Sequence, residues 1–152
     1  MKSCYDQLNQ VAMNAKKKFN IVILEDSEFY NQLLTRQLEN YTDALALDHN
    51  CKFEIQSYTR ANDCLKNLRP DTHVAFVDFH LGSVTALDLI GEIKNKCYGC
   101  KIIVMSLQRN IKTAFETINE GAAEFIHKDV YAMARSCFII EDLVEESLKK
   151  AS

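Results

Sequence analysis

The sequence predicts an α/β fold: a five-stranded, doubly wound parallel sheet with helices on both faces. Short apolar runs alternate with amphipathic segments five times along the chain. The runs at 21–24 and 74–77 contain only apolar residues, as strands covered on both faces do. The length of 152 residues and the 47% hydrophobic content suit one domain with its own core. Strict alternation favours parallel strands because parallel neighbours need right-handed crossover connections.

The first third of the chain predicts an extension, a strand and a helix. Residues 1–18 precede the first strand signal and are expected to form an appended helix or flexible arm, with the domain at 19–152. Residues 21–24 form the first strand. A helix follows, with an apolar side made of Tyr30, Leu33, Leu34, Leu38 and Tyr41 and a polar side that contains Asn31, Gln32, Arg36 and Glu39.

The middle of the chain predicts two more strand and helix pairs. Residues 53–58 alternate in polarity as a half-buried edge strand does, and a short helix at 62–68 is ended by Pro70. The third strand, 74–77, stops at Asp78. A turn at 81–83 then leads into a helix from about residue 85 to residue 96.

The last third repeats the pattern. A strand at 101–105 ends at Ser106, and a strand at 123–127 ends at Lys128. The helix between them should stop at Gly121 and turn inward Ile111, Ala114, Phe115 and Ile118. The final helix should bury one stripe, Met133, Cys137, Ile140, Val144 and Leu148, with its acidic residues mostly in solvent.

Composition excludes several functional classes. The net charge is −3 and the lysines are scattered, so the chain lacks the basic stripe that direct nucleic-acid binding needs. No apolar run has the length of a signal peptide or a membrane span, so we expect a cytoplasmic protein with reduced thiols and no membrane contact. Cys97 and Cys100 have redox or zinc spacing, but they follow a helix and lack further ligands. We interpret them as a loop with two reduced thiols.

Reactive side chains follow four of the five predicted strands. They are Glu25 and Asp26, Asp78, Ser106, and Lys128. Any one acidic residue there could be a turn former, but in an open parallel sheet the strand ends meet at one edge, where ligands bind. Three converging carboxylates require a cation, and Mg²⁺ prefers such oxygen ligands.

This set of side chains suits phosphoryl transfer. An ionised aspartate can attack phosphorus, and Asp78 is the candidate. Lys128 can neutralise the equatorial phosphoryl oxygens opposite a metal, and the Ser106 hydroxyl can donate a hydrogen bond to them.

The segments Leu24-Glu25-Asp26, Val77-Asp78, Met105-Ser106 and Phe125-Ile126-His127-Lys128, in this order, resemble the receiver domain of two-component response regulators (CheY-like). The resemblance covers about residues 19 to 150. It implies a flavodoxin-like strand order, 2-1-3-4-5.

The resemblance also implies a role for each site residue. Asp78 would be the phosphoacceptor and a metal ligand, Asp26 a direct ligand of Mg²⁺, and Glu25 a ligand through water. The backbone carbonyl of His80 would complete the metal site. Lys128 would contact the phosphoryl oxygens, and Ser106 would be the switch hydroxyl. Phe125 would be either the aromatic switch or simple core packing.

By the same resemblance the protein is a switch and not an enzyme for outside substrates; it would assist its own Mg²⁺-dependent phosphotransfer and dephosphorylation. A histidine kinase or histidine phosphotransfer protein would phosphorylate Asp78. No effector domain is visible in the sequence, so we expect output through contact with a downstream protein or through phosphate relay, and not through direct control of transcription. The chain would be a monomer or a phosphorylation-dependent dimer.

Several positions depart from the family pattern. Asp129 stands where the family has a proline in a cis peptide, and a non-proline cis bond costs roughly 3–4 kcal/mol. Gly82 also replaces a frequent proline, and Leu107 replaces a small residue. His80 and Gln108 occupy variable positions that in the family tune the lifetime of the phosphate.

These departures leave open a phosphorylation-independent, receiver-like interaction module. Leu107 could restrict access to Asp78, and Asp129 could change the course of its loop. An aspartate-nucleophile phosphatase is disfavoured, because that chemistry generally wants a second aspartate at the position of His80.

Overall fold

The computed structural model describes residues 3–8 and 16–151, and it confirms the predicted sheet. Five parallel strands pair in the order β2-β1-β3-β6-β7, which is the flavodoxin-like order 2-1-3-4-5 for the strands of this sheet. Their bounds are Lys17–Leu24 (β1), Cys51–Tyr58 (β2), Val74–Asp78 (β3), Lys101–Ser106 (β6) and Glu124–His127 (β7).

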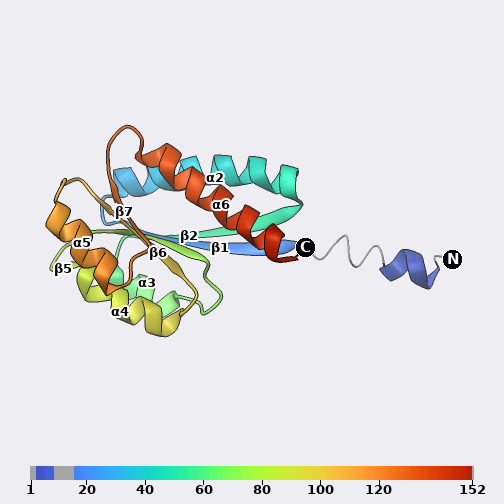
Figure 1. Cartoon of the computed structure of the whole chain (residues 1–152), viewed down its shortest axis with the longest axis horizontal. Helices are drawn as coiled ribbons and strands as arrows, with labels where there is room; N and C mark the ends of the chain where they lie inside the picture. Colours follow the sequence, from blue (N-terminus) through green and yellow to red (C-terminus); the bar gives the residue numbers. More distant parts are fainter. Residues whose placement is uncertain (1–2, 9–15, 152) are drawn as a thin grey trace.

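Helices cover both faces of the sheet (Figure 1). On one face lie α2 (Glu28–His49) and α6 (Ala132–Ala151), which pack over Ile21, Ile23 and Phe76. On the other face lie α3 (Ala61–Asn67), α4 (Ala86–Lys96) and α5 (Ile111–Glu120); α4 packs on Val22 and Val77. The central strands are therefore buried on both sides, which explains why β1 and β3 are apolar without alternation.

The segment before the sheet is only partly described. Residues 4–8 form a short helix, and residues 9–15 of the predicted extension lie outside the described residues. Strand β1 begins at Lys17, two residues before the predicted domain start, so that boundary stays a prediction. Within the described part of the chain, no helix combines the length and apolar character needed to cross a bilayer.

Helix α2 differs from the prediction in length and orientation. It continues to His49, well beyond Tyr41, because Thr42 and Leu45 extend its buried stripe. Asn31, predicted on the polar side, is buried, and Leu33, predicted on the apolar side, is exposed. Ser27 caps this helix by accepting a hydrogen bond from the Tyr30 amide at 3.3 Å, which fixes where the chain turns after β1.

The predicted inward face of α5 is wrong. Ile111, Phe115 and Ile118 are exposed, Ile111 by 88% and Phe115 by 67%. Thr117 is the buried residue of this helix, with Ala114 half-buried beside it. The small side chains of this helix thus face the domain, and the large apolar ones face solvent. Leu148 of α6 is likewise exposed, contrary to its predicted place in the buried stripe.

A two-stranded hairpin follows β3 and was not predicted. It pairs β4 (His80–Leu81) with β5 (Val84–Thr85) across the predicted turn. Gly82 adopts a φ of 71° in this turn. Proline is fixed near a φ of −65°, so the departure to glycine at this position has a conformational reason.

The two cysteines of the 97–100 segment are free and buried. The Sγ atom of Cys97 lies 3.1 Å from the carbonyl oxygens of both Pro70 and Thr72, which share its single S–H donor. Burial raises the pKa of the Cys100 thiol, and the adjacent Cys97 raises it further. These thiols therefore have a packing role in the α4–β6 connection, as the interpretation of reduced thiols implies.

Candidate functional site

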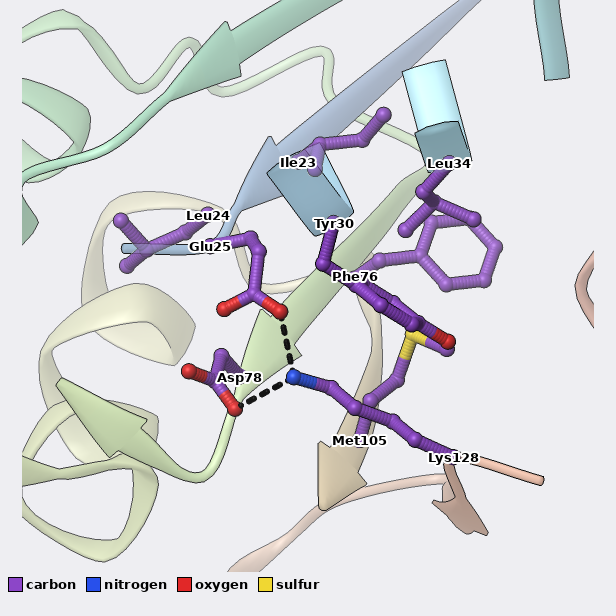
Figure 2. Close-up of a pocket in the computed structure, with 9 residues that line it drawn as sticks. All are labelled: Ile23, Leu24, Glu25, Tyr30, Leu34, Phe76, Asp78, Met105 and Lys128. Atoms are coloured by element: carbon purple, nitrogen blue, oxygen red, sulfur yellow. Dashed lines mark hydrogen bonds and ion pairs between the residues drawn. The ribbon is translucent and has the colours of Figure 1, made fainter. Parts of the chain in front are cut away.

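Four strands of the sheet end at one edge and bring the predicted site residues there. Asp78 is the last residue of β3, Glu25 directly follows β1, and Lys128 directly follows β7. The Lys128 ammonium donates to Asp78 Oδ1 at 3.0 Å and also to Glu25 Oε1 (Figure 2). The side chains of Lys128 and Glu25 are 5% and 3% exposed, so this is a buried ion-pair cluster.

Asp26 completes a group of three carboxylates. One oxygen each from Glu25, Asp26 and Asp78 lies within 4.8 Å of the other two. Asp26 is exposed, whereas Glu25 and Asp78 are buried. The group is thus open to solvent on the Asp26 side, and it holds three acidic groups against one ammonium.

Burial, together with this charge imbalance, raises the pKa of two of the three carboxyl groups. Burial raises the pKa of Asp78 from 3.8 to about 6, helped by the hydrogen bond with Glu25 and opposed by Lys128. Desolvation and a hydrogen bond with Asp78 raise the pKa of Asp26 as well. Lys128 alone does not compensate the three carboxylates, so a further cation would be stabilised here.

The residues present fit a hard divalent cation. Glu25 Oε2 is buried and has no hydrogen-bond partner among the described residues, so a strong acceptor is left unused in the group. Such an atom is costly unless a donor or a cation contacts it. Carboxylate oxygens at this spacing, with solvent access for water ligands, match the preferences of Mg²⁺.

Asn31 holds the backbone that presents Glu25, and the sequence analysis missed it. Its side-chain amide donates to the carbonyl of Glu25 at 3.1 Å and to that of Tyr58 at 3.0 Å. The backbone amide of Glu25 in turn donates to the backbone carbonyl of Tyr58 at 3.0 Å. The spacing of Asn31 to Leu34 and Leu38 would have placed it on the buried side of α2.

Tyr30 is a second residue that was missed. Its ring centroid lies 4.4 Å from the Lys128 ammonium, although the sequence suggested only an apolar contact. Tyr30 lies on α2 and Lys128 follows β7, about a hundred residues later in the chain. No local sequence pattern relates the two positions, so no sequence signal pointed to this pair.

Of the predicted switch residues, Ser106 lies at this edge, and Phe125 lies inside β7, three residues before Lys128. Ser106 ends β6 and is buried; its hydroxyl accepts a hydrogen bond from the Gln108 amide at 3.1 Å. Phe125 of β7 is half-buried against the core. His80 lies in β4 with an exposed side chain whose ring contacts Phe79 edge to face. The metal role of the His80 carbonyl and the switch roles of Ser106 and Phe125 stay predictions.

The loop after Lys128 accommodates Asp129 without a cis bond, since no peptide among the described residues is cis. Asp129 Oδ1 accepts from the Tyr131 amide at 2.8 Å, so its carboxylate orders the turn into α6. His127 Nε2 lies 2.9 Å from the Leu107 carbonyl, and Arg109 Nε lies 3.3 Å from His127 Nδ1. Leu107 itself is exposed, and polar contacts join the two loops beside the site.

Fold and site together define a class: an open α/β domain with a cluster of three carboxylates and a buried lysine at the carboxyl edge of its sheet. A family model, the response regulator receiver domain, matches residues 21–135. The chain therefore belongs to the receiver domains of two-component signalling, a family of phosphoacceptor switches.

The relatives agree with this assignment. The transcriptional regulatory protein CssR of Bacillus subtilis (strain 168) is 31% identical over 88 residues, which are 58% of this chain and 35% of that protein. The chain thus matches about a third of the length of this curated relative.

Solved structures share the fold. A CheY-like receiver domain protein from Methanospirillum hungatei JF-1 is 20% identical, with a TM-score of 0.66 over 89% of this chain and 99% of that one. A response regulator from Burkholderia pseudomallei is 21% identical, with a TM-score of 0.62 over 86% of this chain and 74% of that one. The latter structure contains a phosphorylated aspartic acid, a calcium ion and citrate.

Proposed function

We propose that this domain is a phosphorylation-driven switch in which Asp78 accepts a phosphoryl group from a histidine kinase or a histidine phosphotransfer protein. One observation supports this most directly. Asp78 Oδ1 lies 3.0 Å from the Lys128 ammonium, and oxygens of Glu25 and Asp26 lie within 4.8 Å of an Asp78 oxygen. A nucleophile, a fixed cation and a set of metal ligands thus meet at one point.

The chain supplies the nucleophile, the fixed positive charge and the metal ligands. Asp26 and Asp78 would hold Mg²⁺ directly, Glu25 would act through water, and the His80 carbonyl would complete the protein ligands. Bound Mg²⁺ would neutralise phosphoryl oxygens during transfer. Lys128, already hydrogen-bonded to Asp78, is placed to contact the oxygens on the other side. The same groups would assist hydrolysis of the aspartyl phosphate.

The Ser106 hydroxyl and Phe125 are the proposed switch. In this structure the hydroxyl accepts from the amide of Gln108, two residues later in the loop that leads to α5. Were the hydroxyl to turn toward a phosphoryl group on Asp78, that hydrogen bond would be lost and the loop could shift.

The exposed apolar side chains of this region, Leu107, Ile111, Phe115 and Ile118, support output by protein contact. We place the phosphoryl transfer in the cytoplasm. All six cysteines are free, and thiols stay reduced in that compartment. A phosphorylation-dependent dimer fits the same proposal.

The test is acyl phosphate chemistry on the purified protein. Incubation with acetyl phosphate and Mg²⁺ should add one phosphoryl group by intact mass, and the Asp78→Asn variant should add none. Asp71→Asn is the matched control, because Asp71 is an exposed, ion-paired aspartate at the other end of the sheet. It should be phosphorylated like the wild type.

Other results would point elsewhere. A folded wild-type protein that forms no adduct would favour the phosphorylation-independent module. An adduct that persists in Asp78→Asn would move the acceptor to another residue. Turnover of unrelated phosphoesters would indicate a phosphatase.

A further inference from the structure

The ring of Tyr30 contacts the ammonium of Lys128. The Nζ atom lies 4.4 Å from the ring centroid, within the range of a cation–π interaction. Both residues line a small pocket with Glu25 and Asp78 (Figure 2). Helix α2 brings Tyr30 to this pocket, and the end of β7 brings Lys128.

The hydrogen bonds of Lys128 leave one of its N–H donors without an acceptor among the described residues, and the ring lies against the ammonium. An ammonium has three N–H donors and no acceptor. Two of them are used by Glu25 and Asp78, and no third hydrogen-bond acceptor contacts Nζ within the described ranges 3–8 and 16–151. The side chain is only 5% exposed. The aromatic face therefore takes the place of a third acceptor.

A neutral ring can position the ammonium without neutralising it. Burial and the nearby carboxylates of Glu25, Asp129 and Asp78 raise the pKa of Tyr30 to about 12, so the phenol adds no charge. A third carboxylate here would compete with a phosphoryl group for the ammonium. The ring instead leaves the positive charge of Lys128 available.

We propose that Tyr30 is a positioning residue for phosphoryl transfer, whose ring holds the Lys128 ammonium between Glu25 and Asp78. This rests on the proposed function, in which Lys128 stabilises the transferred group. The ring is the active part of the side chain. The hydroxyl is buried without a hydrogen-bond partner among the described residues, and Figure 2 shows it at the end of the ring away from the carboxylates.

The kinetic test compares two substitutions in the full chain. With acetyl phosphate at saturating Mg²⁺, Tyr30→Leu should form the Asp78 adduct about fivefold more slowly, which corresponds to about 1 kcal/mol of lost cation–π contact. Tyr30→Phe keeps the ring and should stay within about twofold of the wild type. Phe29→Leu is the matched control, since it removes an exposed aromatic ring from the same helical turn and should leave the rate unchanged.

A second measurement tests the contact in the wild-type protein itself. In the NMR spectrum of the wild type, the ring current of Tyr30 should shift the Lys128 side-chain protons next to Nζ upfield, and Tyr30→Phe should keep that shift. Unshifted protons in the wild type would overturn the contact. If Tyr30→Leu does not fold, by circular dichroism, Tyr30→Met takes its place in the kinetic test.

The outcomes separate this inference from the function on which it rests. Absence of an adduct in the wild type overturns the proposed function. An adduct in the wild type, together with an unchanged rate in the folded Leu or Met variant, overturns the positioning role of Tyr30 alone. A slow rate in Tyr30→Phe equal to that of Tyr30→Leu would assign the role to the hydroxyl and also overturn the inference.

Discussion

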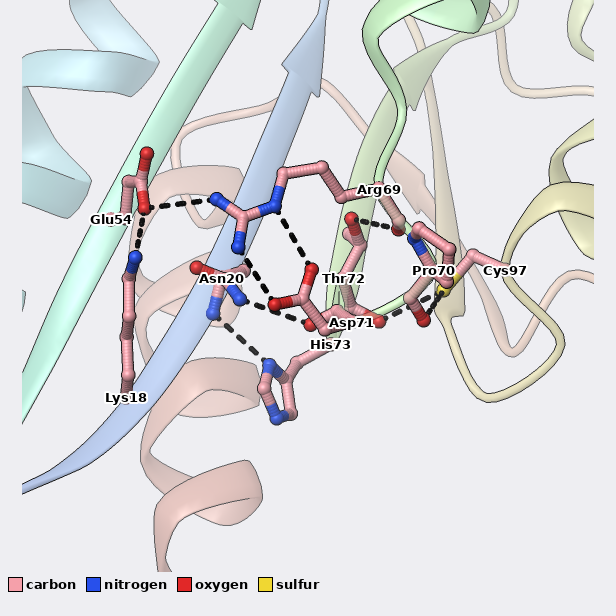
Figure 3. A network of polar contacts seen from close by, with 9 residues as sticks. All are labelled: Lys18, Asn20, Glu54, Arg69, Pro70, Asp71, Thr72, His73 and Cys97. Atoms are coloured by element: carbon pink, nitrogen blue, oxygen red, sulfur yellow. Dashed lines mark hydrogen bonds and ion pairs between the residues drawn. The ribbon is translucent and has the colours of Figure 1, made fainter.

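The two ends of the sheet each hold a charged cluster, but only one has the properties of a site. At the amino end, Lys18 and Arg69 pair with Glu54 and Asp71 (Figure 3). At the carboxyl end, Lys128 alone faces Glu25, Asp26 and Asp78. The first cluster has two cations for two carboxylates and is partly exposed. The second has one ammonium for three carboxylates, and Asp26 is its one exposed member.

The acidities of the two clusters move in opposite directions. Hydrogen bonds from Lys18 and Arg69 lower the pKa of Glu54 and of Asp71. At the carboxyl end, burial raises the pKa of Asp78 to about 6. A compensated surface network is thus stable as it is, whereas the uncompensated buried group favours a proton or a metal ion. The candidate site thus differs from the amino-end cluster in its burial and in its excess of carboxylates over cations. The two clusters hold the same number of charged side chains.

The largest effect should come from removing the buried cation. Lys128→Ala leaves Glu25 and Asp78 buried without their ammonium and should lower the free energy of unfolding by about 3 kcal/mol at pH 7 in EDTA. Urea unfolding measures this. Lys18→Ala is the control, since it breaks a partly exposed pair and should cost less than about 1 kcal/mol. Equal losses at the two ends would contradict the comparison.

An effect of similar size and opposite sign is expected for Asp78→Asn. Because the pKa of Asp78 is raised in the folded protein, the folded state binds a proton more tightly than the unfolded state does. Stability should therefore fall as the pH rises from about 4 to about 6, and it should stay lower above that range.

The Asp78→Asn variant has no carboxyl group at this position, so its stability should not show this fall between about pH 4 and about pH 6. Without metal at pH 7.5 the Asn variant should be about 3 kcal/mol more stable than the wild type in urea. Asp71 has a lowered pKa, so Asp71→Asn should be slightly destabilising instead. A destabilised Asp78→Asn protein would show that the carboxylates are already compensated.

Mg²⁺ should stabilise the carboxyl-end cluster. At ten times its dissociation constant, Mg²⁺ should raise the free energy of unfolding by about 1.4 kcal/mol, and chelation should reverse the gain. The effect should weaken below about pH 6, where protons compete for Asp78. Asp26→Asn should reduce it, and KCl at equal ionic strength should not reproduce it. A gain that survives in Asp26→Asn would place the ion elsewhere.

The smallest effect belongs to the amino end. Arg69→Ala removes contacts at 2.8 Å to Asp71 and 3.4 Å to Glu54, but all three side chains are partly exposed. The expected loss is about 0.5 kcal/mol, and 1 M NaCl should largely abolish it, because salt screens exposed charges. A loss above about 2 kcal/mol, insensitive to salt, would mean that this network stabilises the fold as strongly as a buried pair.

The sequence alone determined the order of the elements and the place of the chemistry. Apolar runs without alternation marked β1 and β3, because strands covered on both faces carry mostly apolar side chains. The residues that end those runs had to meet at one edge, since parallel strands share a direction. The strand order alone therefore predicts that Glu25, Asp26, Asp78 and Lys128 lie together, as they do in the structure.

Only the tertiary structure decided which faces are buried and which distant side chains meet. The same apolar pattern buries Leu34 in α2 but leaves Ile111 and Phe115 of α5 in solvent, because burial depends on the neighbouring element. The contact of Tyr30 with Lys128 and the bond from Asn31 to Tyr58 join segments far apart in the chain. Local periodicity contains no information on such pairs, since packing of α2 against the ends of β2 and β7 creates them.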